Sequence, residues 1–98
     1  MDNLHFEWSP DKARRNKLKH GVSFDEASTV FRDVWSRTIH DPDHSFEEDR
    51  FVTTGLSTAR RLLVVVHTDR CSGIRLISAR IATAQERTVY EERTEKTN

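Results

Sequence analysis

Apolar residues are most concentrated in the stretch 61–81, and this stretch predicts the centre of the fold. It opens on an unbroken run of apolar residues, 62–66, which is rich in β-branched side chains. A run this short and this apolar is typical of a strand that is buried on both faces. A turn-like segment, 69–73, follows it, and a second strand runs from Ile74 to Ile81. We therefore expect a long hairpin in the middle of a sheet.

The second strand of this hairpin carries two arginines, Arg75 and Arg80, among apolar residues. Strict alternation of side chains along a strand would place them on opposite faces. A half-buried arginine needs a partner, so either residue suits a structural ion pair or a head group that reaches solvent. The alternative is an anion site, because the guanidinium fork matches phosphate. The two arginines can line one cleft only if a bulge or the strand end redirects one of them.

The remaining elements are predicted by capping signals and by short alternating runs. A serine or threonine begins each of three helices, and in the second and third a glutamate follows three residues later. The predicted order is strand 5–8, helix 10–20, helix 24–33, strand 38–41, strand 50–54, the hairpin, and helix 84–95, with the last residues frayed. Sequential strands joined by short loops favour a mainly antiparallel sheet. The chain is thus expected to be a single α+β domain, 1–98, with helices packed on its sheet.

The first predicted helix is unusually basic. Lys12, Arg15 and Lys19 recur at spacings that place them on one helical face. Such a face is either a solvated surface or a surface that follows a phosphate backbone. Charge along the whole chain sums to zero, yet residues 51–82 hold five basic and one acidic side chain. This distribution permits a local site for a polyanion on a neutral protein.

Composition narrows the compartment and the chemistry. The single cysteine, Cys71, rules out an intramolecular disulfide and fits a reducing cytoplasm. No apolar run approaches the roughly 18 residues of a membrane span, and no signal-peptide pattern opens the chain. His40 and His44 have the spacing of helical metal ligands, but Pro42 argues against that helix. We therefore expect no metal, no cofactor and no membrane contact.

The remaining polar residues suit cleavage of RNA without a metal ion. In that reaction a 2′-hydroxyl attacks the adjacent phosphate, and arginine stabilises the charge that develops. Lysine, histidine or glutamate moves the protons. The acidic cluster at 47–49 could neutralise arginines or supply a base. A phosphate-binding module or a protein-interaction domain fits these residues almost as well.

Several motifs resemble those of one family. The segments KHGVSF, RLLVVV and IRLISARIAT, followed by ERTVYEE, occur in the order and spacing of the BrnT family of type II toxins. The resemblance implies a RelE-like toxin fold and a metal-independent endoribonuclease that inhibits translation and growth. It also implies a BrnA-type antitoxin with a ribbon-helix-helix domain, in a 2:2 complex that represses its own operon. The antitoxin, and not the toxin, would read the DNA.

The resemblance also suggests site residues. Arg61 and Arg75 would bind phosphate and stabilise the transition state, Lys19 would hold the RNA backbone or transfer a proton, and Glu48 would act as base or position an arginine. Because Asp49 lies beside Glu48, the resemblance does not determine which of the two acids has this role. His67 departs from the family pattern and is not assigned a role. The candidate catalytic residues are Lys19, Glu48, Arg61, Arg75 and Arg80, and the candidate RNA-binding residues are Lys12, Arg15, Lys19 and His20. Alternatives are an inactive module that only pairs with the antitoxin and an mRNA interferase that depends on the ribosome.

Overall fold

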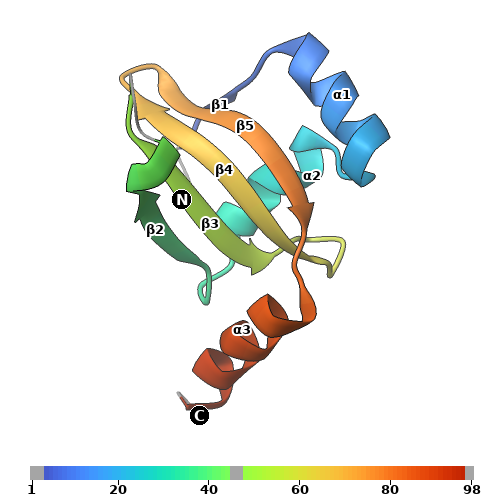
Figure 1. The fold of residues 1–98 in the computed structure, drawn as a ribbon, viewed down its shortest axis with the longest axis vertical. Coiled ribbons are helices and arrows are strands. Elements are labelled where there is room, and N and C mark those ends of the chain that lie inside the picture. The colour runs from blue at the N-terminus through green and yellow to red at the C-terminus, as the bar shows by residue number, and fades with distance from the viewer. Residues whose placement is uncertain (1–3, 45–47, 97–98) are drawn as a thin grey trace.

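A five-stranded sheet in the order β1-β5-β4-β3-β2 forms the centre of the molecule (Figure 1). The structure, a computed structural model, describes residues 4–44 and 48–96. Neighbouring strands are antiparallel except β1, which runs parallel to β5. The elements are β1 (Phe6–Glu7), α1 (Pro10–His20), α2 (Phe24–Ser28), the 3₁₀ helix η1 (Thr29–Arg32), β2 (Arg37–Asp41), the 3₁₀ helix η2 (Pro42–His44), β3 (Arg50–Leu56), β4 (Leu62–Arg70), β5 (Gly73–Ile81) and α3 (Ala84–Lys96).

The α+β class and the order of the main elements are confirmed. β4 is the middle strand, and its first four residues, 62–65, are buried on both faces, as the apolar run predicted. The hairpin is tighter than expected, because β4 continues to Arg70 and β5 already begins at Gly73. Gly73 has φ 141°, and a Cβ there would lie 2.3 Å from the backbone oxygen of His5. Only glycine therefore allows the chain before β1 to pack against this turn.

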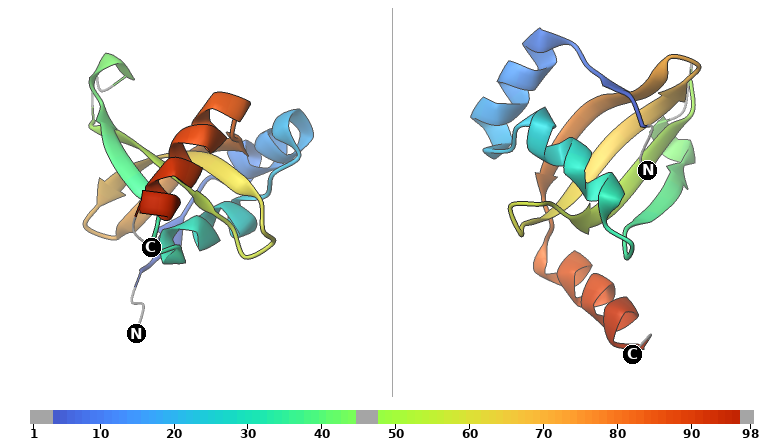
Figure 2. Two further views of the ribbon diagram at one scale, coloured as in Figure 1. Left: turned by 90° about the horizontal axis from the view of Figure 1, so that it is seen from below. Right: turned by 180° about the vertical axis from the view of Figure 1, so that it is seen from behind.

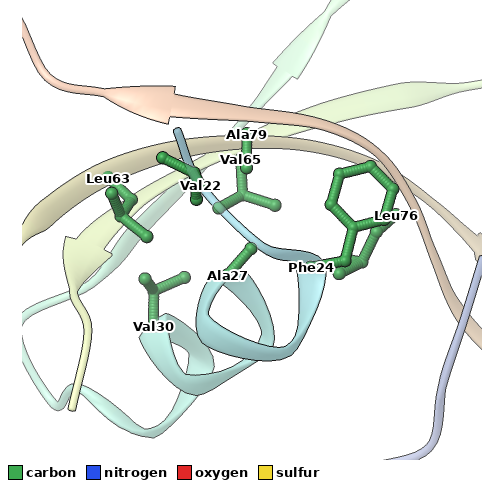
Figure 3. Packing of buried hydrophobic residues seen from close by; sticks show 8 residues of the cluster. All are labelled: Val22, Phe24, Ala27, Val30, Leu63, Val65, Leu76 and Ala79. Atoms are coloured by element: carbon green, nitrogen blue, oxygen red, sulfur yellow. The ribbon is translucent and has the colours of Figure 1, made fainter. Parts of the chain in front are cut away.

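The hydrophobic core lies between the sheet and the helices α1 and α2, which both cover the same face (Figure 2, right). Helix α2 places Phe24 and Ala27 against the sheet, and Leu63, Val65 and Leu76 meet them from β4 and β5 (Figure 3). The buried cluster comprises Val22, Phe24, Ala27, Val30, Leu63, Val65, Leu76 and Ala79. The sheet therefore has a helix-covered face and a far face, the latter carrying Val64, Val66 and Thr68 of β4.

Helix α2 is shorter than predicted, and a 3₁₀ turn replaces its second half. The side-chain hydroxyls of Ser28 and Thr29 donate to the carbonyls of Asp25 and Glu26, at 2.7 Å each. Such bonds compete with regular helical bonding, and the β-branched pair at 29–30 adds crowding. The apolar spacing still holds, because Val30 is buried and Phe31 packs on the core.

A β-bulge in β5 overturns the prediction that Arg75 and Arg80 lie on opposite faces. Leu76 pairs with His67 and Ser78 pairs with Val66, which leaves Ile77 without a partner in β4. The extra residue shifts the alternation by one position. Arg75, opposite Thr68, and Arg80, opposite Val64, therefore share the far face.

Helix α3 projects from the end of the sheet (Figures 1 and 2), and its residues border a hollow with far-face residues of β2 and β3, Ile39 and Val52 among them. The Tyr90 hydroxyl donates to Asp33 Oδ2 at 2.6 Å, and Arg93 donates to the carbonyl of Trp35 at 2.8 Å. Burial and the Asp33 carboxylate raise the pKa of Tyr90, so its hydroxyl stays protonated. None of the helices within 4–44 and 48–96 has the length and apolar composition needed to cross a bilayer.

Candidate nucleic-acid interface

Helix α1 is held against the edge of β5 by one buried side chain, Asn16. Its amide nitrogen donates to the carbonyls of Ala79 at 2.8 Å and Val22 at 3.0 Å, and its oxygen accepts from the Ala79 N–H at 3.0 Å. β1 pairs with β5 only at residues 74 and 75. Further along this edge of β5, the Asn16 amide bonds to the backbone N–H and C=O of Ala79, as a neighbouring strand would. No local pattern indicates this role, because an asparagine in a basic helix resembles a solvated residue.

The anchor at Asn16 decides which basic residues face the sheet. Positions four before and three or four after a helical residue lie on its side of the helix. These positions are Lys12, Lys19 and His20. They border an open hollow of about 240 Å³ between α1 and β5, here called the α1–β5 hollow. Its lining residues are Lys12, Arg15, Asn16, Lys19, His20, Ile77 and Ser78.

All four candidate RNA-binding residues thus gather around one hollow. Within the residues that the structure describes, Lys12, Lys19 and His20 make no ion pair and no side-chain hydrogen bond. Arg15 pairs with Asp11 at 2.7 Å, but its side chain is 77% exposed. Such surface pairs contribute little to stability and exchange readily for another anion. The hollow therefore presents cationic groups that are available to a ligand.

Arg75 is half-buried on the far face, in the same strand as Ile77 and Ser78. It lies between Glu7 of β1 and Thr68 of β4 in the ladder. In the described part of the chain Arg75 has no ion-pair partner, and the buried Thr68 hydroxyl has no hydrogen-bond partner. The charge of Arg75 is therefore also unpaired, a short way along β5 from the α1–β5 hollow.

Arg80, by contrast, is paired with a helix, as one of the two alternatives expected. Its guanidinium donates two hydrogen bonds to Glu86, at 2.8 and 3.0 Å. These bonds lower the pKa of Glu86 to about 2 and raise the pKa of Arg80. Glu86 also accepts from the backbone N–H of Thr83, which completes the predicted capping box. Arg80 thus joins β5 to the start of α3.

Arg61 is also committed to an internal partner. Its guanidinium binds the Glu26 carboxylate through two nitrogens and also donates to the carbonyl of Gly21. Ser57 donates to the same carboxylate at 2.7 Å, and the Arg61 contact lowers the pKa of Glu26. The predicted capping box at Ser23 is therefore half formed: Ser23 accepts from the Glu26 N–H at 3.1 Å, while the carboxylate turns to Arg61.

Glu48 lies at the opposite end of the sheet from Arg61. Its carboxylate is 3.5 Å from the guanidinium of Arg70, the last residue of β4, whereas Arg61 directly precedes β4. A nine-residue strand spans about 30 Å. One catalytic centre cannot contain both side chains in this structure. Glu47 of the predicted acidic cluster lies outside the described residues.

His40 and His44, which have the spacing of helical metal ligands, each lie beside an aspartate. His40 lies 3.0 Å from Asp49 and His44 lies 2.8 Å from Asp41. Within 4–44 and 48–96, no three acidic, histidine or cysteine side chains gather in a way that could hold a metal ion.

His67 is buried on the helix-covered face. Its ring bonds to Thr53 Oγ1 at 2.8 Å and lies between Phe31 and Phe51. Asp69 is 3.5 Å from its other ring nitrogen, too far for a good hydrogen bond, and burial lowers the pKa of His67. His67 is therefore a neutral core residue.

The family match indicates what kind of protein carries this candidate interface. A family model described as the ribonuclease toxin BrnT of type II toxin–antitoxin systems matches residues 8–86. The chain belongs to the BrnT family. It is therefore a ribonuclease toxin by family, and an antitoxin is its expected partner. A search of curated proteins gave no match.

A solved BrnT structure has the same fold. The ribonuclease toxin BrnT of Brucella abortus is 20% identical to this chain, with a TM-score of 0.60. The similarity covers 83% of this chain and 99% of that one. The part matched by the BrnT family model contains all of α1 and β5, and most of α3 lies beyond it. All residues that line the α1–β5 hollow therefore lie within the part of the chain that the family model matches.

Proposed function

We propose that this BrnT-family chain is an endoribonuclease that cleaves RNA without a metal ion and arrests growth until an antitoxin binds it. The observation that carries the proposal is a set of cations without ion-pair partners among the described residues: Lys12 and Lys19 at the α1–β5 hollow, and Arg75 on the far face of β5. Arg61, just before β4, and Arg80, near the end of β5, are instead paired with the carboxylates of Glu26 and Glu86. Unpaired cations on rigid elements suit a phosphate backbone.

In the proposed reaction, a ribose 2′-hydroxyl attacks the adjacent phosphate and the 5′-oxygen of the next nucleotide leaves. The products are a 2′,3′-cyclic phosphate and a free 5′-hydroxyl. Arg75 stabilises the added negative charge of the phosphorane, because its guanidinium is rigidly placed on a strand. Lys19 holds the backbone or transfers a proton at the leaving oxygen.

The other candidate residues have supporting roles in this proposal. Arg61 holds α2 through Glu26, and Arg80 holds α3 through Glu86. Glu48 positions Arg70.

A second candidate is a module that binds the antitoxin but no longer cleaves RNA. It is favoured by the internal ion pairs, because three of the five candidate catalytic residues, Glu48, Arg61 and Arg80, already have partners. The two functions differ in whether pure protein cuts pure RNA. A ribosome-dependent interferase would cut only when ribosomes are added.

The proposed antitoxin is a BrnA-type ribbon-helix-helix dimer that brings two toxin chains into one cytoplasmic complex. It represses its own operon through its DNA-binding domain, and the toxin makes no base contacts. Antitoxin binding covers the cations of α1, so RNA and antitoxin compete for the toxin.

The decisive experiment is incubation of purified chain with naked RNA in excess EDTA, with and without antitoxin. We expect cleavage that persists in EDTA, leaves 2′,3′-cyclic phosphate ends and stops when antitoxin is added. Cleavage that disappears in EDTA and returns with a divalent ion would show that the mechanism is wrong. Cleavage only on added ribosomes would favour the interferase, and no cleavage in either case would favour the binding module.

A further inference from the structure

We infer that the α1–β5 hollow is a subsite for one unstacked nucleobase of single-stranded RNA, with the flanking phosphates held by the cations on its rim. This inference rests on the proposed function and specifies its substrate class. The cations bind phosphates, and recognition of a base requires further groups in the hollow.

The apolar wall of the hollow comes from the bulge in β5. Ile77 has no partner in β4 and β1 does not reach it, so its side chain lines the hollow instead of the sheet's core. The hollow measures about 240 Å³. Sites for drug-sized ligands are usually larger, roughly 300–1,000 Å³. The space therefore suits a single base better than a longer segment.

Two polar side chains are free to meet the edge or the face of a base. Ser78 makes no side-chain hydrogen bond with the described residues, and a hydroxyl can donate and accept. His20 offers a flat ring on which a base can stack. Asn16 is not available, because both ends of its amide already bond to backbone groups. Base preference should therefore depend mainly on Ser78.

The arrangement favours a single strand over a duplex. A base can enter a hollow only when it is unpaired and turned outward, whereas a duplex keeps its bases stacked inside. Lys12, Arg15 and Lys19 stand on the rim, where the phosphates on either side of an inserted base would lie. An acidic peptide could satisfy these cations but would give Ile77 and Ser78 no role.

The test uses single-stranded oligonucleotides about ten nucleotides long, made with 2′-fluoro riboses so that they cannot be cleaved. Each internal position is made abasic in turn, and affinity for the purified chain is measured by fluorescence anisotropy. We expect one abasic position to weaken binding roughly tenfold, as loss of one base contact does. Ile77→Ala should erase this difference. Ile81→Ala, a half-exposed isoleucine of the same strand outside the hollow, should preserve it.

Ser78→Ala provides a second variant that keeps the apolar wall. It should reduce the difference in affinity among the four bases at the sensitive position, with little effect on overall binding.

Equal affinity for all abasic oligonucleotides, or equal affinity for a poly-glutamate peptide of the same charge, would overturn the subsite. Cleavage of ordinary RNA, measured separately, would still support the proposed ribonuclease in that case. Conversely, a position-dependent base preference without any cleavage would support the subsite and overturn the nuclease. If no RNA binds at all, both proposals fail.

Discussion

Arg75 and Arg80 share the far face of β5 but differ in what neutralises their charge. Arg80 is held by the Glu86 carboxylate through two hydrogen bonds. Arg75 is half-buried between Glu7 and Thr68 in the ladder and has no ion-pair partner among the residues that the structure describes. A free guanidinium on a strand is suited to a substrate phosphate, whereas a paired one is suited to holding two elements together.

We predict opposite effects of replacing these two arginines. Arg75→Ala should lower the RNA cleavage rate by about 10²–10³-fold, as loss of one transition-state donor does, with the melting temperature close to wild type. Arg80→Ala should mainly destabilise, by about 1 kcal/mol, because it leaves Glu86 without its partner at a site that is partly exposed. Cleavage assays and thermal melts on both variants measure these effects. Arg87→Ala, at a weak surface pair on α3, is the control.

A stable but inactive Arg80→Ala, together with an active Arg75→Ala, would show that catalysis uses the paired arginine.

Residue identity alone could not separate free from paired arginines. The predicted alternatives for Arg80 included a partner on a helix, and Glu86 fills that place. Arg61 was expected to meet phosphate, yet it binds Glu26, which is 35 positions away in the chain. A local pattern carries no information about a contact of that range, because it depends on how α2 packs beside the start of β4.

At the scale of elements, α1 combines a structural and a binding surface. Asn16 fixes one side of the helix to the edge of β5, and Lys12 and Arg15 border the adjoining hollow. Arg14 and Lys17 belong to the same helix but do not line the hollow. Arg14 and Lys17 therefore serve as a control for Lys12 and Arg15, because they carry the same charge on the same helix.

We predict that Lys12→Ala combined with Arg15→Ala weakens RNA binding and makes it less sensitive to salt. Two fewer phosphate contacts on a single strand should flatten the slope of log affinity against log salt by about 1.4. Arg14→Ala combined with Lys17→Ala removes the same charge and should change the slope less. Anisotropy titrations at several salt concentrations measure both slopes, and equal slopes for the two double variants would mean that α1 acts only through net charge.

The boundaries of α1 were predictable and the course of β5 was not. Ser9, Pro10 and Gly21 define the helix through local chemistry, and Gly21 adopts the left-handed conformation of a helix end, with φ 71°. The bulge at Ile77 has no local signal, since RLISARI reads as a regular strand. Its position depends on the register with β4, which only the folded sheet determines.

At the scale of the whole molecule, stability should fall in two separate ranges of acid pH. Burial lowers the pKa of His67 below its ordinary 6.5, so the unfolded chain takes up this proton first and stability declines below about pH 6.5. Arg80 lowers the pKa of Glu86 from 4.5 to about 2, so its contribution is present above pH 4.5 and is lost between there and pH 2.

Urea unfolding at a series of pH values tests this prediction. His67→Gln should flatten the decline just below pH 6.5, and Glu86→Gln should flatten the decline below pH 4.5, so each variant serves as control for the other. A profile of His67→Gln that runs parallel to wild type from pH 7 to 5 would show that His67 takes up its proton without cost in the fold.

The sheet as a whole was only partly predictable. Short connections correctly indicated antiparallel pairing for the later strands, but nothing local showed that β1 runs parallel to β5 at the edge. The sequence also could not show that Glu48 and Arg61 lie at opposite ends of β4, because both border the same strand-rich region. Distances of this kind arise from strand length and register together.

The bulge in β5 also determines which shortening of the chain the sheet can tolerate. Loss of one residue from a strand normally turns every following side chain to the other face. Deleting Ile77 should leave the following side chains on their present faces, because Leu76 and Ser78 already pair with the adjacent residues His67 and Val66.

We predict that this deletion leaves a folded, cooperatively melting protein that has lost its preference for an intact base, while deletion of Val65 from β4 prevents folding. Circular dichroism, thermal melts and the abasic series compare the two, and an unfolded Ile77 deletion would mean that the bend at the bulge is itself required. If the Ile77 deletion folds, the shortened chain keeps its sheet and loses the wall of the hollow.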